Sequence, residues 1–285
     1  MNSKDLYSVL LQELHCRVNV MTRQTVEGQM VVIYDDHRWL LNVLFAANKH
    51  IERPNLITFD AHDDADQCAK KTELLKQIGV EDLKNATAKQ FGAFVDYDQR
   101  PDDGGWLTTA MELNLIDSVV NIGNRHGHNF EDMNGIYESE DGVEHNVFEM
   151  SQDLEHELGS RGKLGDTCRE GECRALRDLF GIEYFYTYAH CMEIEEPYVL
   201  DFDLDFFTMS SNDEPTHGWT ERVLNRHFPV NSEQDKFLRR LIRDAHIITI
   251  CREPDYCGSL GDSNRLLSLL DRYYFEGQLG TDVTL

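Results

Sequence analysis

The sequence has few basic residues and no long apolar run, and each absence excludes a class of protein. Only 27 residues are Lys or Arg against 52 Asp or Glu, and the resulting formal net charge of −25 would repel nucleic acid. No apolar run approaches the length of a membrane helix, and the polar N-terminus is not that of a signal peptide. We therefore expect neither a nucleic acid nor a membrane as partner.

Paired cysteine motifs are also missing. The chain has seven cysteines, an odd number, and none form a C-x-x-C pair. This usage predicts reduced thiols in a cytoplasmic protein, with a bridge between Cys168 and Cys173 as the alternative. A hydrophobic content of 41% over 285 residues is typical of a globular protein. We expect a single domain spanning residues 1–285.

The stretch from Asn55 to Asp64 is the most informative part of the chain. Leu56 to Phe59 reads as a buried strand, and Asp60, His62 and Asp64 follow it at every second position. Side chains with this spacing can lean to one side, where carboxylates and an imidazole would repel or desolvate one another without a cation. This donor set suits Mn first, with Fe, Co, Ni or Zn as further candidates. The alternative is a solvated acidic turn.

A second acidic cluster makes the metal site the better interpretation. In Val199-Leu200-Asp201-Phe202-Asp203-Leu204-Asp205-Phe206-Phe207, acids alternate with large apolar residues. A solvated loop has no need for Leu and Phe between its acids, whereas a buried strand that carries its carboxylates to one side does. A buried row of carboxylates needs a metal.

The order of predicted elements indicates the fold class. Strands and helices alternate almost from end to end, and this pattern predicts an α/β protein with a three-layer architecture, in which a mostly parallel sheet has helices on both faces. Two segments are expected to be irregular, a turn-rich link at 91–105 and an insertion or lid around 129–170 with a short helix near 149–158. The predicted strands lie at 30–34, 56–59, 118–122, 183–188, 198–202 and 245–250. The predicted helices lie at 4–16, 38–50, within 66–92, and at 106–115, 219–227, 232–245 and 259–274.

Polar groups follow five of the predicted strands. In a parallel sheet, ligands bind beyond the carboxyl ends of the strands. The residues in those positions are His37, Asp60 to Asp64, His126, Asp203 to Asp205 and Glu253 to Asp255. Together they are a more specific signal than any one motif.

These motifs resemble those of the arginase/deacetylase (ureohydrolase) superfamily. Its D-x-H-x-D pattern falls on Asp60, His62 and Asp64, its later D-x-D on Asp203 and Asp205, and its first histidine, preceded by an acid, on His37. The stretches Asp-Asp-His-Arg-Trp-Leu-Leu and Thr-Ile-Cys-Arg-Glu-Pro-Asp-Tyr-Cys-Gly are similar to the small arginase-like branch that includes peptide arginases of ribosomal peptide maturation. The resemblance covers roughly residues 30–258 and implies an arginase-like fold.

The resemblance also implies a cofactor and a ligand set. It places two Mn(II) ions in each chain, one held by His37, Asp60, Asp64 and Asp203, the other by His62, Asp60, Asp203 and Asp205. Asp60 and Asp203 would bridge the ions. The family's chemistry is hydrolysis of a guanidino group to urea and an amine. Asp201 would be an acceptor behind the metal ligands or the partner of a Lys or Arg.

Further roles are implied for residues after two strands. The Gly-Asn-Arg-His-Gly stretch resembles a family motif in which the histidine shuttles a proton, which makes His126 a candidate catalytic residue and Asn124 a substrate contact. A structural or substrate-positioning role for His126 is the alternative, because the stretch lies far beyond Asp64. Glu253 or Asp255 would bind the guanidinium, and the sequence does not decide between them.

The function that these observations favour is a cytoplasmic, Mn-dependent peptide arginase. It would convert arginine in a precursor peptide, its partner, to ornithine with release of urea. One alternative is a ureohydrolase of free arginine or agmatine, and another is an amide deacylase on the same fold. The third is a non-catalytic binder of a basic peptide. The oligomeric state is left open.

Overall fold

The computed structural model describes residues 21–24, 29–99, 104–123, 135–150, 197–211 and 214–280 of the chain. The helix predicted at 4–16 and the strand predicted at 183–188 lie outside the described residues. So do Asn124, His126, Cys168 and Cys173, which leaves the predictions made for them as predictions.

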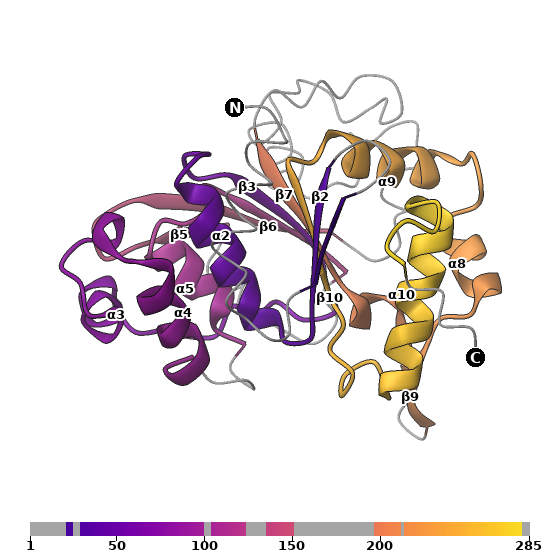
Figure 1. Ribbon diagram of the computed structural model, residues 1–285. Coiled ribbons are helices and arrows are strands. Elements are labelled where there is room, and N and C mark those ends of the chain that lie inside the picture. The colour runs from indigo at the N-terminus through magenta and orange to yellow at the C-terminus, as the bar shows by residue number, and fades with distance from the viewer. Residues whose placement is uncertain are drawn as a thin grey trace.

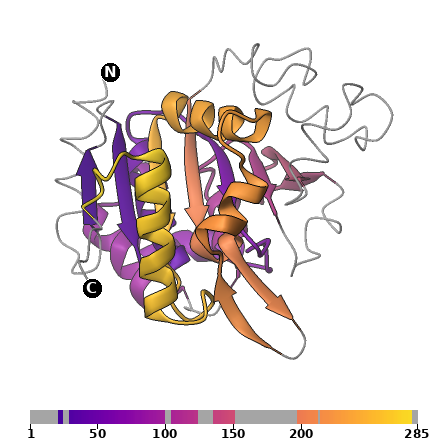
Figure 2. The same cartoon turned by 90° about the vertical axis from the view of Figure 1, so that its right-hand side faces the viewer.

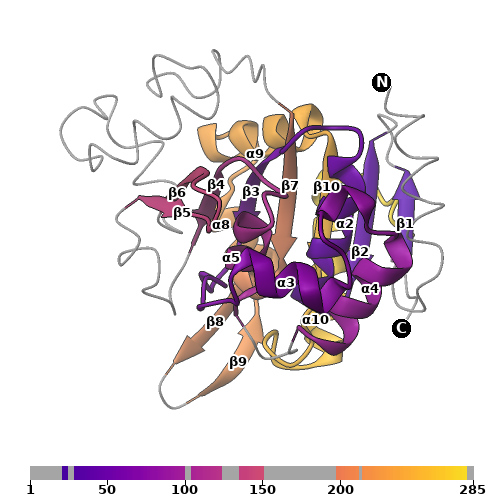
Figure 3. The same cartoon turned by 90° about the vertical axis from the view of Figure 1, so that its left-hand side faces the viewer.

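An eight-stranded sheet forms the centre of the molecule, in the order β1-β2-β10-β7-β3-β4-β6-β5. The six inner strands run parallel, whereas β1 and β5 pair antiparallel at the two edges (Figure 3). The strand bounds are β1 Met21–Gln24, β2 Met30–Tyr34, β3 Asn55–Phe59, β4 Val119–Ile122, β5 Ile136–Glu138, β6 Glu144–Met150, β7 Tyr198–Asp203 and β10 Ile247–Cys251.

Helices cover both faces of this sheet, so the predicted three-layer α/β architecture is confirmed (Figure 1). One layer contains η1 His37–Trp39, α2 Leu40–Asn48, α3 Lys71–Ile78, η2 Leu83–Asn85, α4 Ala88–Tyr97 and α5 Trp106–Glu112. The other contains α8 Glu221–His227, α9 Glu233–Asp244 and α10 Leu260–Tyr274. The short helix η6 Leu204–Phe207 leads into a small hairpin of β8 Thr208–Ser211 and β9 Glu214–Gly218, which extends beyond the sheet (Figure 2).

Alternation along the strands divides the core into two layers. Val31 and Ile33 pack with α8, α9 and α10, whereas Met30, Val32 and Tyr34 pack with α2, α4 and α5. Successive side chains of a strand point to opposite faces, so a central strand buried on both sides must be apolar at nearly every position. This explains the continuous apolar runs from which the strands were predicted.

Local signals set several helix ends. Thr87 and Gln90 form a reciprocal capping box at α4, and the N-cap Ser232 accepts a hydrogen bond from the Asp235 backbone N–H at α9. Gly79 ends α3 with φ +82°, a left-handed conformation that suits glycine. Asp36 accepts from the Arg38 backbone N–H and so caps η1.

The strands β2 and β3, which follow one another in the chain, run parallel and are separated in the sheet by β10 and β7. Two details of the predicted organisation differ from the structure. The predicted link at 91–105 contains most of α4, because Phe91, Phe94 and Val95 supply the apolar face of a helix. Of the expected insertion at 129–170, residues 135–150 contribute β5 and β6 to the sheet, and the remainder, with most of the helix expected near 149–158, lies outside the described residues. Within the described part of the chain, no helix has both the length and the apolar character needed to cross a membrane.

Candidate metal centre

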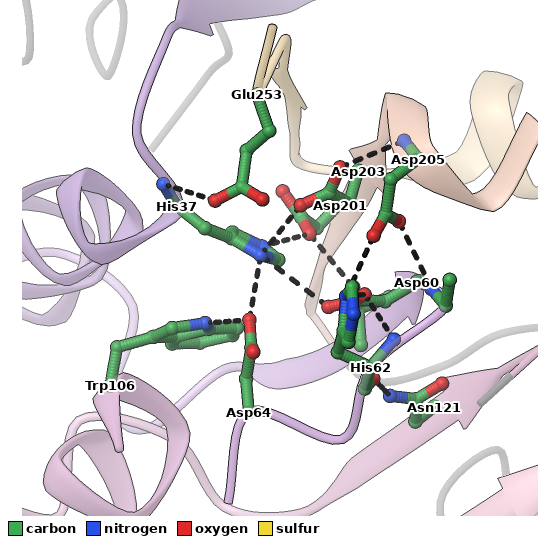
Figure 4. A network of polar contacts seen from close by, with 12 residues as sticks. His37, Asp60, His62, Asp64, Trp106, Asn121, Asp201, Asp203, Asp205 and Glu253 are labelled. Carbon is green, nitrogen blue, oxygen red and sulfur yellow. Dashed lines mark hydrogen bonds and ion pairs between the residues drawn. The ribbon is translucent and has the colours of Figure 1, made fainter. Parts of the chain in front are cut away.

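Four neighbouring parallel strands end at one site. They are β2, β10, β7 and β3, which lie side by side in the middle of the sheet. Because their carboxyl ends share one edge, the segments that follow them are brought together although they are far apart in the chain. Figure 4 shows His37 after β2, Glu253 after β10, Asp203 and Asp205 at the end of β7, and Asp60 to Asp64 after β3.

The loop after β3 is held by its own backbone and by α5. Asp60 Oδ1 accepts a hydrogen bond of 2.7 Å from the His62 backbone N–H. Asp64 has a positive φ of 46°, and its carbonyl accepts from the Leu107 backbone N–H at 3.1 Å. The indole N–H of Trp106 donates to Asp64 Oδ2. The first turn of α5 thus fixes the far end of the acidic loop.

A hydrogen bond joins the two acidic segments directly. Asp205 Oδ1 accepts from the Ala61 backbone N–H at 3.1 Å, and Asp203 Oδ1 accepts from the Asp205 backbone N–H at 3.0 Å. Asp60, Asp203 and Asp205 are at most 2% exposed. The predicted meeting of the two acidic stretches is therefore present in the structure, in a buried setting.

The His37 imidazole lies between these acids. Its Nδ1 atom is 2.9 Å from Asp64 Oδ2, 3.0 Å from Asp203 Oδ2 and 3.4 Å from Asp60 Oδ2. On the other side of the ring, Nε2 is 2.8 Å from Asp201 Oδ2. The Trp106 ring packs beside the imidazole with centroids 4.5 Å apart. The ring is thus held on both edges and along its side.

The second imidazole, His62, lies at the open side of the site. Its Nδ1 atom is 2.7 Å from Asp205 Oδ2 and 3.9 Å from Asp60 Oδ1. The side chain is 31% exposed, against 3% for His37. Tyr256, which is 47% exposed, approaches it edge-on with ring centroids 5.4 Å apart. The site is therefore more open on the His62 side than on the His37 side.

Burial and mutual repulsion disturb the protonation of the acids. Burial, reinforced by the negative charges of neighbouring aspartates, raises the pKa of Asp60 well above its usual value. The same causes, burial first and the charge of Asp205 second, raise the pKa of Asp203 to about 7. Burial acts to raise the pKa of Asp64 as well, but the His37 imidazole and the Trp106 N–H outweigh it and the pKa is lowered.

The two imidazoles are shifted toward their charged forms. Burial acts to lower the pKa of His37, but the carboxylates of Asp201 and Asp203 raise it well above the usual value. Burial also opposes the shift of His62, whose pKa is raised by Asp205. Without a metal, the site therefore balances its negative charge by holding protons, both on carboxyl groups and on imidazoles.

The donor atoms fit divalent cations. Two groups of atoms, each within 4.8 Å of one another, contain His37, Asp60 and Asp64 in one case and Asp60, His62 and Asp205 in the other. Asp60 belongs to both, as the predicted bridge requires. Among the described residues, the buried atom Asp60 Oδ2 has no hydrogen-bond partner, and the buried His37 Nδ1, although 2.9–3.4 Å from three carboxylate oxygens, forms no well-aligned hydrogen bond with them. Buried polar atoms of this kind need a partner, and a cation of the Mn type suits mixed carboxylate and imidazole donors.

Glu253 extends the site on the β10 side, whereas Asp255 does not. Glu253 Oε1 accepts from the His37 backbone N–H at 3.2 Å, and a Glu253 oxygen forms a third donor group with His37 and Asp203. Burial and the charge of Asp203 raise the pKa of Glu253. Its φ of 33° is uncommon for a residue with a side chain. Asp255 is an exposed residue of the same loop.

Several side chains that shape the site were not predicted from the sequence. Trp106 was placed only as the start of a helix, yet it contacts both His37 and Asp64. Thr58 and Thr249 donate to Asp201 from the two strands beside β7. Strand alternation shows that each threonine faces one side of its strand, but only the strand order shows that they flank the same carboxylate.

Comparisons with known proteins give similarity at the level of structure alone. No protein-family model matches the chain, and no curated protein matches it. One similar solved structure is proclavaminate amidino hydrolase from Streptomyces clavuligerus, with 14% identity, a TM-score of 0.46 and 88% of this chain covered. This chain spans 64% of the length of that hydrolase. Another is arginase from Bacillus caldovelox, with 13% identity, a TM-score of 0.42, and coverage of 99% of this chain and 75% of that one. Similarity this low gives no information about activity.

Proposed function

We propose that this protein is a divalent-metal hydrolase of guanidino groups, and that its substrate is arginine within a peptide. The observation that carries the proposal is the pair of overlapping donor groups that share Asp60, with the carboxylate of Glu253 beside them. The resemblance of the same residues to ureohydrolase motifs supports it. A site for one structural ion would not need this many buried acids.

The residues proposed to hold two Mn(II) ions follow from the geometry and the motif. His37, Asp60 and Asp64 form one group, and Asp60, His62 and Asp205 form the other. Asp203 lies 3.0 Å from His37 Nδ1 through Oδ2 and is proposed as the second bridge. When bound, a pair of such ions lowers the pKa of a water molecule and orients it for attack on carbon.

Glu253 is proposed to receive the guanidinium. A carboxylate can accept two parallel N–H bonds from a guanidinium, and this arrangement would fix the orientation of the central carbon. The bond from the His37 backbone N–H holds one oxygen of Glu253 beside the donor groups. Asp255, which is exposed, is the weaker of the two candidates.

The proton that the leaving amine requires is assigned to His126. Hydrolysis of a guanidinium by water gives urea and an amine, and the amine nitrogen must gain a proton as its bond to carbon breaks. Histidine suits this transfer because its ordinary pKa lies near neutral pH. His126 and the proposed substrate contact Asn124 follow β4, the strand next to β3 in the sheet.

A peptide substrate is proposed on electrostatic grounds. The net charge of −25 attracts a cationic peptide and raises its encounter rate at low salt. Substrate would enter past His62 and Tyr256, which are both partly exposed. An arginine side chain on a peptide can extend into such a site while the backbone remains outside.

The test is to incubate the full chain with Mn(II) and an arginine-containing peptide and to record both peptide mass and urea. We expect each converted arginine to lose a CN2H2 unit and to release one urea. Free arginine, agmatine and an acetyl-lysine peptide run in parallel separate this activity from a free-substrate ureohydrolase and from a deacylase. Asp60→Asn should abolish metal binding and urea together, whereas Asp255→Asn should change neither. Peptide binding without urea from any guanidine would replace the proposal with a non-catalytic binder.

A further inference from the structure

Asp201 is a buried carboxylate that stands behind the metal centre. It is 0% exposed and lies in β7, two residues before Asp203. It belongs to none of the three donor groups formed by the described residues. A carboxylate in such a place is costly unless its oxygens are satisfied, so its contacts indicate what it is for.

The strand register builds a polar row around this residue. Asp201 is paired with Thr58 of β3 on one side and with Thr249 of β10 on the other. All three side chains point to the face of the sheet that packs on α2 and α5, because Leu56, Val199 and Ile247, each two residues earlier, belong to that core layer. Three adjacent strands thus aim their polar side chains at one point.

Both oxygens of Asp201 are used. Thr249 Oγ1 donates to Oδ1 at 2.5 Å and Tyr34 OH donates to the same oxygen at 3.1 Å. Oδ2 accepts from Thr58 Oγ1 at 2.8 Å and lies 2.8 Å from His37 Nε2. Three of these four partners are hydroxyl groups, and the fourth is the His37 imidazole, which contacts Asp201 through a ring nitrogen. A carboxylate held in this way cannot turn aside from the ring.

We infer that Asp201 is a positioning residue that sets the tautomer and the ring orientation of His37 for one of the two ions. The inference rests on the metal centre of the proposed function, but not on its substrate. Asp201 Oδ2 can only accept, so the proton of a neutral imidazole stays on Nε2. The lone pair then lies on Nδ1, the atom that faces Asp60, Asp64 and Asp203. Carboxylates that orient a ligating histidine in this way strengthen its bond to the metal.

The inference predicts an asymmetric effect, because Asp201 contacts only one of the two imidazoles. His37 belongs to the group with Asp60 and Asp64, whereas His62 belongs to the group with Asp60 and Asp205. Removing the carboxylate should therefore lower the affinity for the ion held by His37 and leave the affinity for the other ion unchanged. Loss of a residue that merely stabilises the fold would lower the affinity for both ions.

The first test is a titration of the full-length chain with Mn2+, in which free ion is followed by electron paramagnetic resonance. We expect Asp201→Asn to bind one ion with wild-type affinity and the other about 10- to 100-fold more weakly. The matched control Thr249→Val removes a hydroxyl donor but keeps the carboxylate next to His37, and it should bind both ions with nearly wild-type affinity. In a His37→Ala background, Asp201→Asn should cause no further loss.

Equal weakening of both ions in Asp201→Asn, or wild-type affinity at both, would overturn the inference. A second measurement needs no variant, so it holds even if Asp201→Asn does not fold. The Zn2+-loaded wild-type protein, labelled with 15N in histidine, should show the proton of His37 on Nε2 and the metal on Nδ1. The reverse assignment, or failure of the wild type to bind either ion, also refutes it. A protein that passes these tests but releases no urea would lose the proposed function and keep this one.

Discussion

Removing the metal should make this protein less stable as the pH rises from 5 to 7. The reason is that Asp60, Asp203 and Glu253 have raised pKa values, chiefly because they are buried together. At pH values between the pKa of such an acid in the unfolded chain and its higher pKa in the native protein, the native protein holds a proton that the unfolded chain has released. Stability therefore falls with rising pH across that interval. Ordinary acid denaturation has the opposite slope over this range.

The histidines act in the same direction. Because the pKa of His37 and of His62 is raised, each contributes stability that is complete below its unfolded pKa of 6.5 and is lost as the pH rises through its folded value. Asp64 is the exception, because its pKa is lowered. Its contribution is present above the unfolded value of 3.8 and is lost only as the pH falls through a still lower value, outside the interval considered.

The magnitude can be worked from Asp203 alone. Its pKa moves from 3.8 to about 7, so at pH 5 the native carboxyl is protonated and the unfolded one is ionised, whereas at pH 7 the native carboxyl has lost about half of its protons. A proton held only by the native state changes stability by 1.36 kcal/mol per pH unit, and because the proton is lost near pH 7 the total from pH 5 to pH 7 is about 2 kcal/mol. For domains of this size 1 kcal/mol corresponds to roughly 2–4 °C in Tm, so the expected fall is roughly 4–8 °C. Saturating Mn(II) should remove or reverse this slope, because binding displaces the protons and becomes tighter as the pH rises.

The assay is thermal unfolding of chelator-treated protein at pH 5, 6, 7 and 8, repeated with excess Mn(II). The matched control is Asp203→Asn, which removes one titrating group and should flatten the slope without metal. A metal-free wild-type Tm that rises between pH 5 and pH 7 would show that the acids are not buried together as described. An equally steep slope in Asp203→Asn would show that another group is responsible.

Three further substitutions test other parts of the structure. Glu253→Gln should lower kcat/KM for a guanidino substrate about 10- to 100-fold with metal content unchanged, and Asp255→Asn, measured beside it, should have no effect. Trp106→Phe keeps the ring beside the imidazole but removes the N–H donor to the acidic loop, so Mn(II) titration should show about 10-fold weaker binding and an unchanged fold. Gly258→Ala would place a Cβ atom 2.1 Å from a β9 carbonyl oxygen at φ +96°, and denaturant unfolding should show a loss of at least about 2 kcal/mol. Gly277→Ala, at φ +75° with nothing within 4 Å of its Cβ position, should lose less, and equal losses would contradict the packing at Gly258.

The sequence was sufficient to predict the strands and helices that have apolar runs or a regular apolar period, and to predict that acids follow the ends of strands. The runs at 30–34 and 56–59 became β2 and β3, and the acids that follow β3 and β7 lie side by side, as Asp60 and Asp205 do in one donor group. Strand alternation accounts for this result, because a strand buried on both faces must be apolar and the first polar residues beyond it mark its carboxyl end. The strands β5 and β6 were missed because they carry charged residues between their apolar ones and lack a continuous run.

The strand order could not be predicted from the sequence, and the second layer of the site depends on it. Thr58 and Thr249 are separated by almost two hundred residues and become neighbours only because β7 lies between β3 and β10. Nothing in their local sequence distinguishes them from other threonines in strands. Trp106 is similar, since its contact with Asp64 depends on how α5 packs against the acidic loop. Residues of this kind are found through tertiary contacts alone.

Hydrogen bonds from backbone N–H groups hold the acids of the site in place. The acids therefore cannot move apart to reduce their mutual repulsion, and their negative charge must be neutralised instead. The Ala61 N–H holds Asp205, the Asp205 N–H holds Asp203, and the His62 N–H holds Asp60, so each acid is fixed by a main-chain donor. The backbone atoms that make these bonds belong to loops anchored in a parallel sheet. Separating the acids would break those bonds in a buried region, where an unpaired N–H is costly. The remaining ways to balance the charge are protons or metal ions, and the two compete for the same oxygens. The pH dependence predicted above therefore measures the same property that would make this site bind divalent cations.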